Sequence, residues 1–253
     1  MKIVADENLA FTDYFFSEFG TIQHVAGRNL SHQDVVDADA LLVRSVTKVN
    51  AALVKNTALR YVGSATIGTD HLDIQALNAA GIPWSNAAGC NAQAVAEYVI
   101  TALLHLKPEL ISAEQNFCLG IVGLGNVGSR LATMAQFLGW QVIAYDPLVR
   151  KEHVTQVEFS ALLAQADAIS IHVPLTKTGQ YPTYHLFNAA SLTQMKPNAI
   201  LINSARGPVV EEAALMQDIR VTHRQVVLDV FEHEPEISEE LLQLLALATP
   251  HIA

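Results

Sequence analysis

The sequence has few cysteines, few basic residues and no long apolar run, and each shortage argues against a class of protein. Its two cysteines, Cys90 and Cys118, cannot form a disulfide framework, which favours a reducing cytoplasm. Lysine and arginine total 15 against 25 acidic residues, and this net charge of −10 argues against nucleic acid as the main partner. The nearest approach to a membrane-spanning helix, residues 92–106, is interrupted by Glu97 and His105 and falls short of the roughly 18 apolar residues needed.

Short apolar runs rich in β-branched residues alternate with helical patterns through most of the 253 residues. Such alternation predicts an α/β protein with parallel sheets and crossover helices. The predicted strands are residues 2–5, 22–25, 40–43, 60–63, 84–86, 117–122, 141–145, 168–172, 199–203 and 225–229. The predicted helices are residues 31–37, 50–56, 70–80, 91–106, 127–139, 160–165 and 211–218. Four of them begin at a residue of capping type, namely Ser31, Asn50, Asp70 and Ser160.

The order of these segments predicts two consecutive Rossmann-like lobes, residues 1–92 and 93–253, with the long helix at residues 91–106 between them. The first residues predict a strand rather than a secretory signal. Ligands of doubly wound folds bind beyond the carboxyl ends of the strands, so we expect a cleft between the lobes.

A glycine-rich turn follows the strand predicted at residues 117–122. The turn reads Gly123-Leu124-Gly125-Asn126-Val127-Gly128. Gly123 permits a tight turn, Gly125 lets the backbone approach a pyrophosphate, and Gly128 allows close packing of helix against strand. The N–H groups at the helix start, including those of Asn126 and Val127, then hold the phosphates.

The next predicted strand ends at Asp146, 18 residues after Gly128. A carboxylate in this place accepts hydrogen bonds from the adenosine ribose and repels a 2′-phosphate, so NAD is favoured over NADP. A glycine-rich turn without a ligand is the alternative. The strand, the helix, the second strand and its terminal acid together favour the cofactor, and no metal is expected.

Three later strand ends carry the groups that a hydride transfer requires. His251 can take the hydroxyl proton, because the pKa of histidine lies near neutrality. Arg206 can grip a carboxylate with two parallel hydrogen bonds, and Glu234 can stabilise an imidazolium beside it. Singly, each has an ordinary explanation: a surface ion pair, a solvated loop acid, a histidine near a chain end. Their joint occurrence behind a dinucleotide motif favours catalysis.

The chain resembles the D-isomer-specific 2-hydroxyacid dehydrogenases along essentially its whole length. The matching segments are residues 123–128, 203–207, 228–235 and 249–251. The resemblance implies a flavodoxin-like substrate-binding domain at residues 1–92 and an NAD-binding Rossmann domain at 93–253. It makes Arg206, Glu234 and His251 the catalytic residues, assigns Asp229 to the nicotinamide carboxamide, and places Val173 on the adenosine side of NAD.

The N-terminal half is similar to one branch of this family. The segments that carry the similarity are residues 6–8, 43–50, 65–71 and 88–92. They imply NAD-dependent oxidation of 4-phospho-D-erythronate, a step of vitamin B6 biosynthesis. The resemblance assigns Ser45 and Thr66 to substrate contact beside Arg44, whereas turn capping is their ordinary alternative. Cys90 has no neighbouring histidine or acid in the sequence, so we expect a packed small residue rather than a nucleophile.

Members of the family continue beyond the Pro-His pair, return over the first lobe and end in a dimerisation domain. Because this chain ends two residues after His251, we expect both segments to be absent. We also expect His251 to lie on a frayed terminus and the fragment to fold with little activity. The apolar surface that the missing segment would cover should be exposed. The longer protein is expected to be a homodimer.

Two alternatives stay open. A relative acting on 3-phosphoglycerate, glyoxylate or another small D-2-hydroxyacid shares the core motifs, so only the N-terminal segments discriminate. A dinucleotide-sensing co-repressor would bind NAD without turnover, and the catalytic residues and the acidic charge weigh against it.

Overall fold

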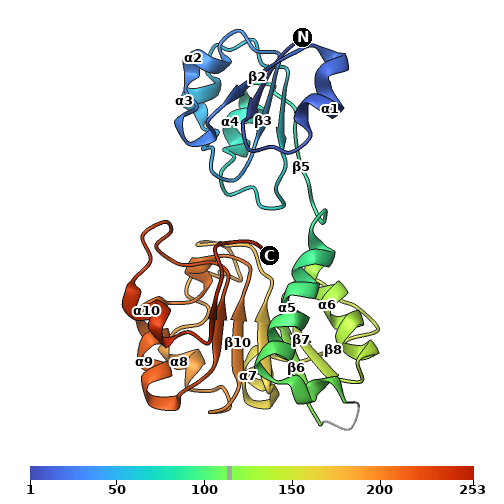
Figure 1. The fold of residues 1–253 in the computed structure, drawn as a ribbon, viewed down its shortest axis with the longest axis vertical. Helices are drawn as coiled ribbons and strands as arrows, with labels where there is room; N and C mark the ends of the chain where they lie inside the picture. Colours follow the sequence, from blue (N-terminus) through green and yellow to red (C-terminus); the bar gives the residue numbers. More distant parts are fainter. Residues whose placement is uncertain (113–115) are drawn as a thin grey trace. The chain divides into compact units, whose positions relative to one another are not determined.

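The computed structural model describes residues 1–112 and 116–253, which form two compact units, Met1–Cys90 and Asn91–Ala253. Each unit has its own sheet with helices packed on it (Figure 1). Every strand pairing within the two sheets is parallel, as predicted.

The first unit contains a five-stranded sheet in the order β2-β1-β3-β4-β5. This is the flavodoxin-like order of a doubly wound sheet. Its strands are β1 (Lys2–Asp6), β2 (Thr21–Val25), β3 (Ala40–Val43), β4 (Tyr61–Ser64) and β5 (Trp84–Asn86). Its helices are α1 (Thr12–Phe16), α2 (His32–Val35), α3 (Ala51–Val54) and α4 (Ile74–Ala79), with 3-10 turns η1 (Ser17–Phe19) and η2 (Gly27–Asn29). Val4, Leu41 and Val62 bury their side chains fully in its core.

The second unit contains a seven-stranded sheet in the order β12-β11-β10-β9-β6-β7-β8. Its strands are β6 (Cys118–Val122), β7 (Gln141–Tyr145), β8 (Thr155–Gln156), β9 (Ala168–Ile171), β10 (Ile200–Asn203), β11 (Val226–Leu228) and β12 (Leu247–Ala248). The strand order reverses between β6 and β9, and ligands of a Rossmann fold bind at such a switch point.

Helices cover both faces of the second sheet, so its central strands are apolar throughout. All residues of β6, β9 and β10 are buried, as expected for a parallel sheet between two helical layers. One core contains α5 (Ala92–Leu106) and α6 (Asn126–Phe137), which lie side by side in Figure 1. The other contains α7 (Phe159–Gln165), α8 (Ala189–Leu192), α9 (Glu212–Thr222) and α10 (Glu239–Leu244). The 3-10 turns are η3 (Pro108–Ile111) and η4 (Gly207–Val209).

Of the four predicted cap residues, two are correct and two are wrong. Ser31 precedes α2, and the Asn50 side chain accepts a hydrogen bond from Leu53 at the start of α3. The cap of α4 is Asp73 instead of Asp70, because the Asp73 side chain accepts the Ala76 N–H at 2.9 Å. Helix α7 begins one residue before Ser160.

Several short elements are absent from the prediction, namely α1, α8, α10, β8 and β12. Helix α1 and the η1 turn carry exposed aromatic rings instead of an apolar face turned inward. Phe11 is 72% exposed, Tyr14 78% and Phe15 60%.

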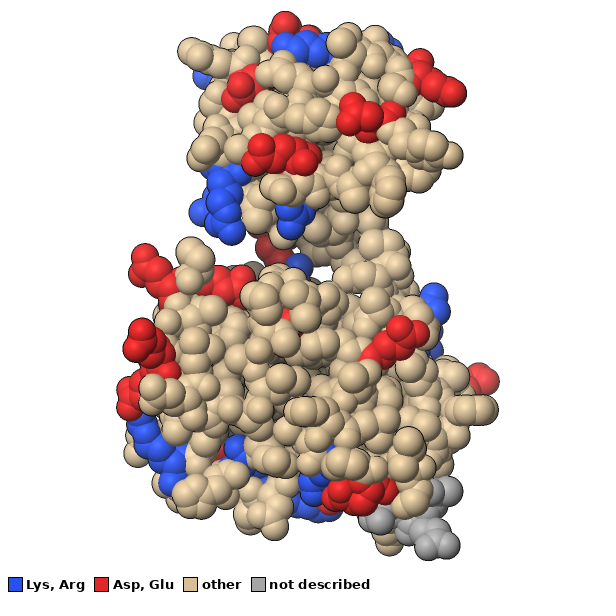
Figure 2. All heavy atoms as spheres, viewed as in Figure 1, with Lys and Arg blue, Asp and Glu red and all other residues tan. Residues whose placement is uncertain are grey.

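Basic side chains on the face shown in Figure 2 occur in small groups separated by acidic and uncharged surface. Among the described residues, no helix combines the length and apolar character needed to cross a membrane.

Candidate active site

The glycine turn lies at the carboxyl end of β6, where side chains cannot be accommodated at two positions. Gly123 has φ +98°, and a Cβ there would lie 2.4 Å from the carbonyl oxygen of His172. A Cβ on Gly128 would lie 1.9 Å from the carbonyl oxygen of Gly123. Gly123 therefore lies in a tight turn and Gly128 lets α6 pack closely on that turn, as the sequence predicts.

Gly125 differs from both, because a Cβ built on it would meet no described atom within 4 Å. Packing within the protein therefore does not explain why residue 125 is a glycine. The N–H groups of Asn126 and Val127 follow at the start of α6, where helical N–H groups have no intrahelical partner. Open space beside unpaired N–H groups fits a pyrophosphate, so the residues present fit NAD.

Asp146 lies just beyond β7, the strand next to β6, and its carboxylate faces the glycine turn. Its Oδ2 accepts the Leu124 N–H at 2.7 Å, and its Oδ1 accepts the N–H groups of Leu148 and Val149 at 2.9 Å. These bonds fix the carboxylate beside the turn. Each carboxylate oxygen has more than one acceptor site, so ribose hydroxyls can share them.

The residues after β9 line the same turn. A Cβ on Gly123 would lie 3.0 Å from Cγ1 of Val173, which places Val173 against the glycine loop. The Nε2 atom of His172 lies 2.8 Å from the Ser170 hydroxyl, and burial lowers the pKa of His172 to about 3. His172 is therefore neutral at physiological pH.

The segments that follow β10, β11 and β12 bring the three predicted catalytic residues together. Nδ1 of His251 lies 3.7 Å from Oε2 of Glu234. The contact with His251 is the largest cause of a lowered pKa of Glu234; burial opposes it, and the Phe231 N–H and the charge of Arg206 lower the pKa further. Glu234 is therefore held ionised beside a histidine and an arginine.

Asp229 holds the segment that carries His251. It is fully buried, and its carboxylate accepts hydrogen bonds from the Thr249 hydroxyl at 2.6 Å and from the N–H groups of Ile252 and Ala253 at 2.8 and 2.9 Å. The His251 N–H donates to the Asp229 carbonyl at 2.9 Å. The expectation of a frayed terminus is therefore wrong. The assignment of Asp229 to the nicotinamide carboxamide stays a prediction.

Two residues that support the candidate active site were not predicted from the sequence. Tyr98 on α5 hydrogen-bonds the Thr249 hydroxyl at 2.7 Å, and burial raises the pKa of Tyr98. Ser204, just beyond β10, has a buried hydroxyl without a hydrogen-bond partner among the described residues. Its position at a strand end beside Arg206 was the available signal. Such an orphaned hydroxyl at the carboxyl edge of the sheet fits a polar ligand there.

The predicted substrate residues belong to the first unit, at the carboxyl ends of neighbouring strands. Arg44 and Ser45 follow β3, and Thr66 follows β4. The Thr66 hydroxyl lies 2.9 Å from that of Ser64, which in turn lies 2.9 Å from Nε2 of His71. The role of Arg44, Ser45 and Thr66 in substrate contact stays a prediction.

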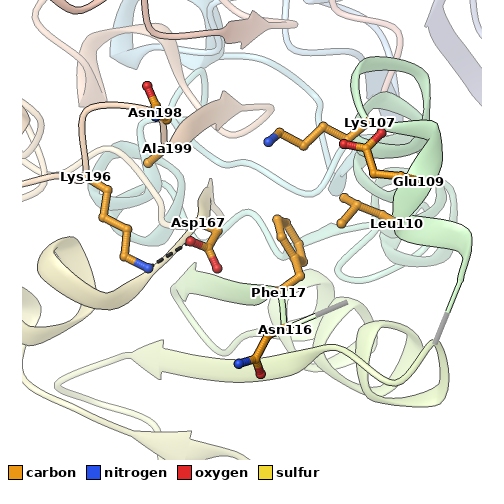
Figure 3. Close-up of a pocket in the computed structure, with 9 residues that line it drawn as sticks. All are labelled: Lys107, Glu109, Leu110, Asn116, Phe117, Asp167, Lys196, Asn198 and Ala199. Carbon is orange, nitrogen blue, oxygen red and sulfur yellow. Dashed lines mark hydrogen bonds and ion pairs between the residues drawn. The ribbon is translucent and has the colours of Figure 1, made fainter. Parts of the chain in front are cut away.

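A separate cavity of about 300 Å³ lies at the opposite edge of the second sheet (Figure 3). Phe117, Asp167 and Ala199 line it, and each of them directly precedes a strand. Lys196 forms an ion pair with Asp167 at 2.8 Å across its wall. Because ligands of doubly wound sheets bind at the carboxyl ends, we assign the candidate active site to the glycine-turn edge.

The two cysteines differ in exposure. Cys90 is exposed, so the expectation that it is packed was wrong, and Cys118 is buried. Within residues 1–112 and 116–253, no group of three or more His, Cys, Asp or Glu is arranged to hold a metal ion.

Comparison with known proteins adds a family and close relatives. Residues 107–253 match the model of the D-isomer specific 2-hydroxyacid dehydrogenase NAD-binding domain. The chain is 72% identical over all of its 253 residues to an erythronate-4-phosphate dehydrogenase of Acinetobacter baumannii and spans 71% of that protein's length. It is 46% identical to the enzyme of the same name from Psychrobacter cryohalolentis, of which it spans 73%.

Solved structures give the same fold. A Thermus thermophilus protein superimposes with a TM-score of 0.87 at 26% identity, over 100% of this chain and 89% of that one. The D-lactate dehydrogenase of Aquifex aeolicus, solved with NAD and lactic acid, superimposes with a TM-score of 0.84 at 22% identity, over 100% and 88%.

Proposed function

The chain belongs to the D-isomer-specific 2-hydroxyacid dehydrogenase family, and we propose that it oxidises the C2 hydroxyl of 4-phospho-D-erythronate. The products are 3-hydroxy-2-oxo-4-phosphooxybutanoate, NADH and a proton. The glycine turn and Asp146 would hold NAD, which would supply the acceptor for the hydride of C2. The reaction would serve pyridoxine 5′-phosphate (vitamin B6) biosynthesis.

The observation that carries the proposal is the pairing of His251 with an ionised Glu234 near Arg206. His251 takes the proton of the C2 hydroxyl as the hydride leaves. Glu234 stabilises the imidazolium that results, because a neighbouring carboxylate favours the charged form. Arg206 binds the substrate carboxylate and so orients C2, since a guanidinium matches a carboxylate in bidentate geometry.

The substrate is inferred from the close relatives, which are erythronate-4-phosphate dehydrogenases. Arg44, Ser45 and Thr66 supply a cation and two hydroxyls at the carboxyl ends of β3 and β4. Groups of this kind bind a phosphorylated, polyhydroxylated acid. We further propose that a version of the chain extended to the length of its relatives is a homodimer.

The test is a substrate panel read by NADH formation, run on this chain and on a version extended at its C-terminus. The panel contains 4-phospho-D-erythronate, unphosphorylated D-erythronate, 3-phosphoglycerate and D-lactate. We expect kcat/KM to be at least about 10-fold higher for 4-phospho-D-erythronate than for the others, because loss of one charged hydrogen bond costs about 1.5–3 kcal/mol.

His251→Asn is the matched variant, and it should lower kcat by about 10²- to 10⁴-fold while NADH still binds. Faster oxidation of 3-phosphoglycerate would overturn the substrate assignment. Tight NADH binding with no turnover of any panel member by the extended chain would instead indicate an NAD-sensing protein.

A further inference from the structure

A largely buried cluster of ionisable side chains lies next to the proposed catalytic loops of the second unit. Nε2 of His185 lies 2.5 Å from Oε1 of Glu232. Oε2 of Glu232 accepts the Glu212 N–H at 3.1 Å, and Oε1 of Glu212 accepts the Glu232 N–H at 2.5 Å. Glu212 is 8% exposed and the Glu232 side chain 11%, so both carboxylates are largely withdrawn from water.

The cluster joins three separate segments. His185 belongs to the loop after β9, and its N–H donates to the carbonyl of Pro208 at 2.9 Å. Pro208 lies two residues beyond Arg206, and Glu212 opens α9 a few residues later. Glu232 belongs to the loop after β11 that also carries Glu234. The cluster therefore ties the Arg206 turn to the Glu234 loop.

The two loops are also in direct backbone contact. A Cβ on Gly207 would lie 1.9 Å from the carbonyl oxygen of Phe231, so these loops approach as closely as a glycine permits. The Phe231 N–H donates to Oε1 of Glu234 at 2.9 Å. A displacement of Glu232 would therefore move Phe231 and, with it, the hydrogen bond that orients Glu234.

The charge on Glu232 makes the cluster sensitive to the loss of either of its partners, His185 or Glu212. Burial opposes ionisation of Glu232, but hydrogen bonds from His185 and the Glu212 N–H, with the positive charges of His185 and His233, leave the pKa of Glu232 lowered. Removing one partner of a buried ion pair strongly destabilises the folded protein, because the remaining charge is left uncompensated. His185 is itself held by stacking on Tyr184, with ring centroids 3.9 Å apart.

We propose that His185, Glu232 and Glu212 are positioning residues that set the orientation of Glu234 and Arg206 relative to His251. This inference rests on the proposed function, in which those three residues carry the chemistry. Directional hydrogen bonds fix the angle between the two loops, which apolar packing of the same volume would not do. A misplacement of about 1 Å in a catalytic group can cost on the order of 10²-fold in rate.

The test compares variants that break the cluster with variants that conserve its hydrogen bonds. His185→Phe keeps a ring on Tyr184 and removes the bond to Glu232, whereas His185→Gln can still donate. Glu212→Leu removes the acceptor of the Glu232 N–H, and Glu212→Gln retains it. His24→Phe is the matched control, because His24 forms an exposed pair with Asp13 at 3.0 Å in the first unit.

We expect His185→Phe and Glu212→Leu to lower kcat by about 10- to 100-fold while Kd for NADH stays within about twofold. His185→Gln, Glu212→Gln and the His24→Phe control should stay near wild type. The acid limb of kcat/KM should also move to lower pH in His185→Phe, because the imidazolium of His251 loses a well-placed carboxylate.

Wild-type turnover tests the proposed function, and the variants test the positioning role. Unchanged kcat and an unmoved acid limb in folded His185→Phe would overturn the inference, as would equal losses in the Phe and Gln variants. If wild type turns over no panel substrate, the His251 imidazole titration followed by NMR replaces the rate. An identical titration midpoint in wild type and His185→Phe would then refute the positioning role.

Discussion

Alanine substitutions at Gly125 and Gly128 should separate cofactor binding from folding, although both glycines lie in the same turn. At Gly125 the added methyl group meets no described atom within 4 Å, and the backbone (φ −68°, ψ −156°) is open to alanine. Stability should be unchanged or raised by about 0.4–1 kcal/mol. At Gly128 the methyl group would lie 1.9 Å from the carbonyl of Gly123, which costs at least about 1–3 kcal/mol.

The affinity for NADH should respond to these substitutions differently from the stability. A methyl group on Gly125 occupies the space in which the backbone approaches the pyrophosphate, so one charge-assisted hydrogen bond is lost or lengthened. Such a bond contributes about 1.5–3 kcal/mol, and Kd for NADH should rise by about 10- to 150-fold. Fluorescence titration with NADH gives Kd, and urea unfolding of the same samples gives stability.

Gly125→Ala should thus bind NADH weakly while keeping normal stability. Gly128→Ala should be a destabilised protein. Wild-type affinity for NADH in Gly125→Ala would refute the placement of the pyrophosphate at this turn. Wild-type stability in Gly128→Ala would refute the packing argument.

Three further outcomes follow from other parts of the second unit. Asp146→Ser should reduce the preference for NADH over NADPH, because the carboxylate beside the glycine turn repels a 2′-phosphate; the ratio of the two Kd values measures this, and an unchanged ratio would contradict it. Glu234 has a lowered pKa in the folded protein, so its contribution to stability is present above the unfolded-state value of about 4.3 and is lost as pH falls through the folded-state value. Glu234→Gln should therefore flatten the fall of unfolding free energy on acidification below about pH 5, and an unchanged slope in urea titrations would argue against an ionised Glu234. Phe187 is fully buried with its ring 5.6 Å from that of Phe159, so Phe187→Ala should cost about 3–5 kcal/mol in urea unfolding, and a cost below about 1 kcal/mol would contradict its place in the core.

The central strands β6, β9 and β10 of the second sheet were predictable because their apolar runs are buried on both faces. β3, β5 and β7 have the predicted bounds, and most other predicted strands differ by one residue at an end. β8 and β12 are only two residues long, which is too short for an apolar pattern. Helix α1 carries exposed rings, so it offers no periodic apolar face to detect.

The wrong cap predicted for α4 is explained by the path of the turn before the helix. Asp70 and Asp73 are both good capping residues, and the sequence does not show which of them lies next to the first helical N–H groups. The Leu72 N–H donates to the carbonyl of Thr69 at 2.9 Å, which places residues 69–72 in a turn and leaves the cap to Asp73. The selection depends on the path of the turn, which is set by tertiary contacts.

The convergence of Arg206, Glu234 and His251 was predictable because the carboxyl ends of parallel strands share one edge. The cluster of His185, Glu232 and Glu212 was not. Its bonds join residues 47 and 20 positions apart, and no short motif marks them. Buried ionisable groups that pair across loops are visible only once the loops are placed.

The loop after β11 carries two carboxylates that hold both members of the acid/base pair, and of these Asp229 is fully and Glu232 largely buried. Asp229, at its start, accepts the N–H groups of Ile252 and Ala253 and so holds the segment of His251. Glu232, three residues later, accepts the Glu212 N–H and bonds to His185, and so holds the backbone that orients Glu234. Each carboxylate is satisfied by a different neighbouring segment, so removing one should displace one partner of the pair. A neutral substitution at Asp229 should therefore act mainly on His251, and one at Glu232 mainly on Glu234.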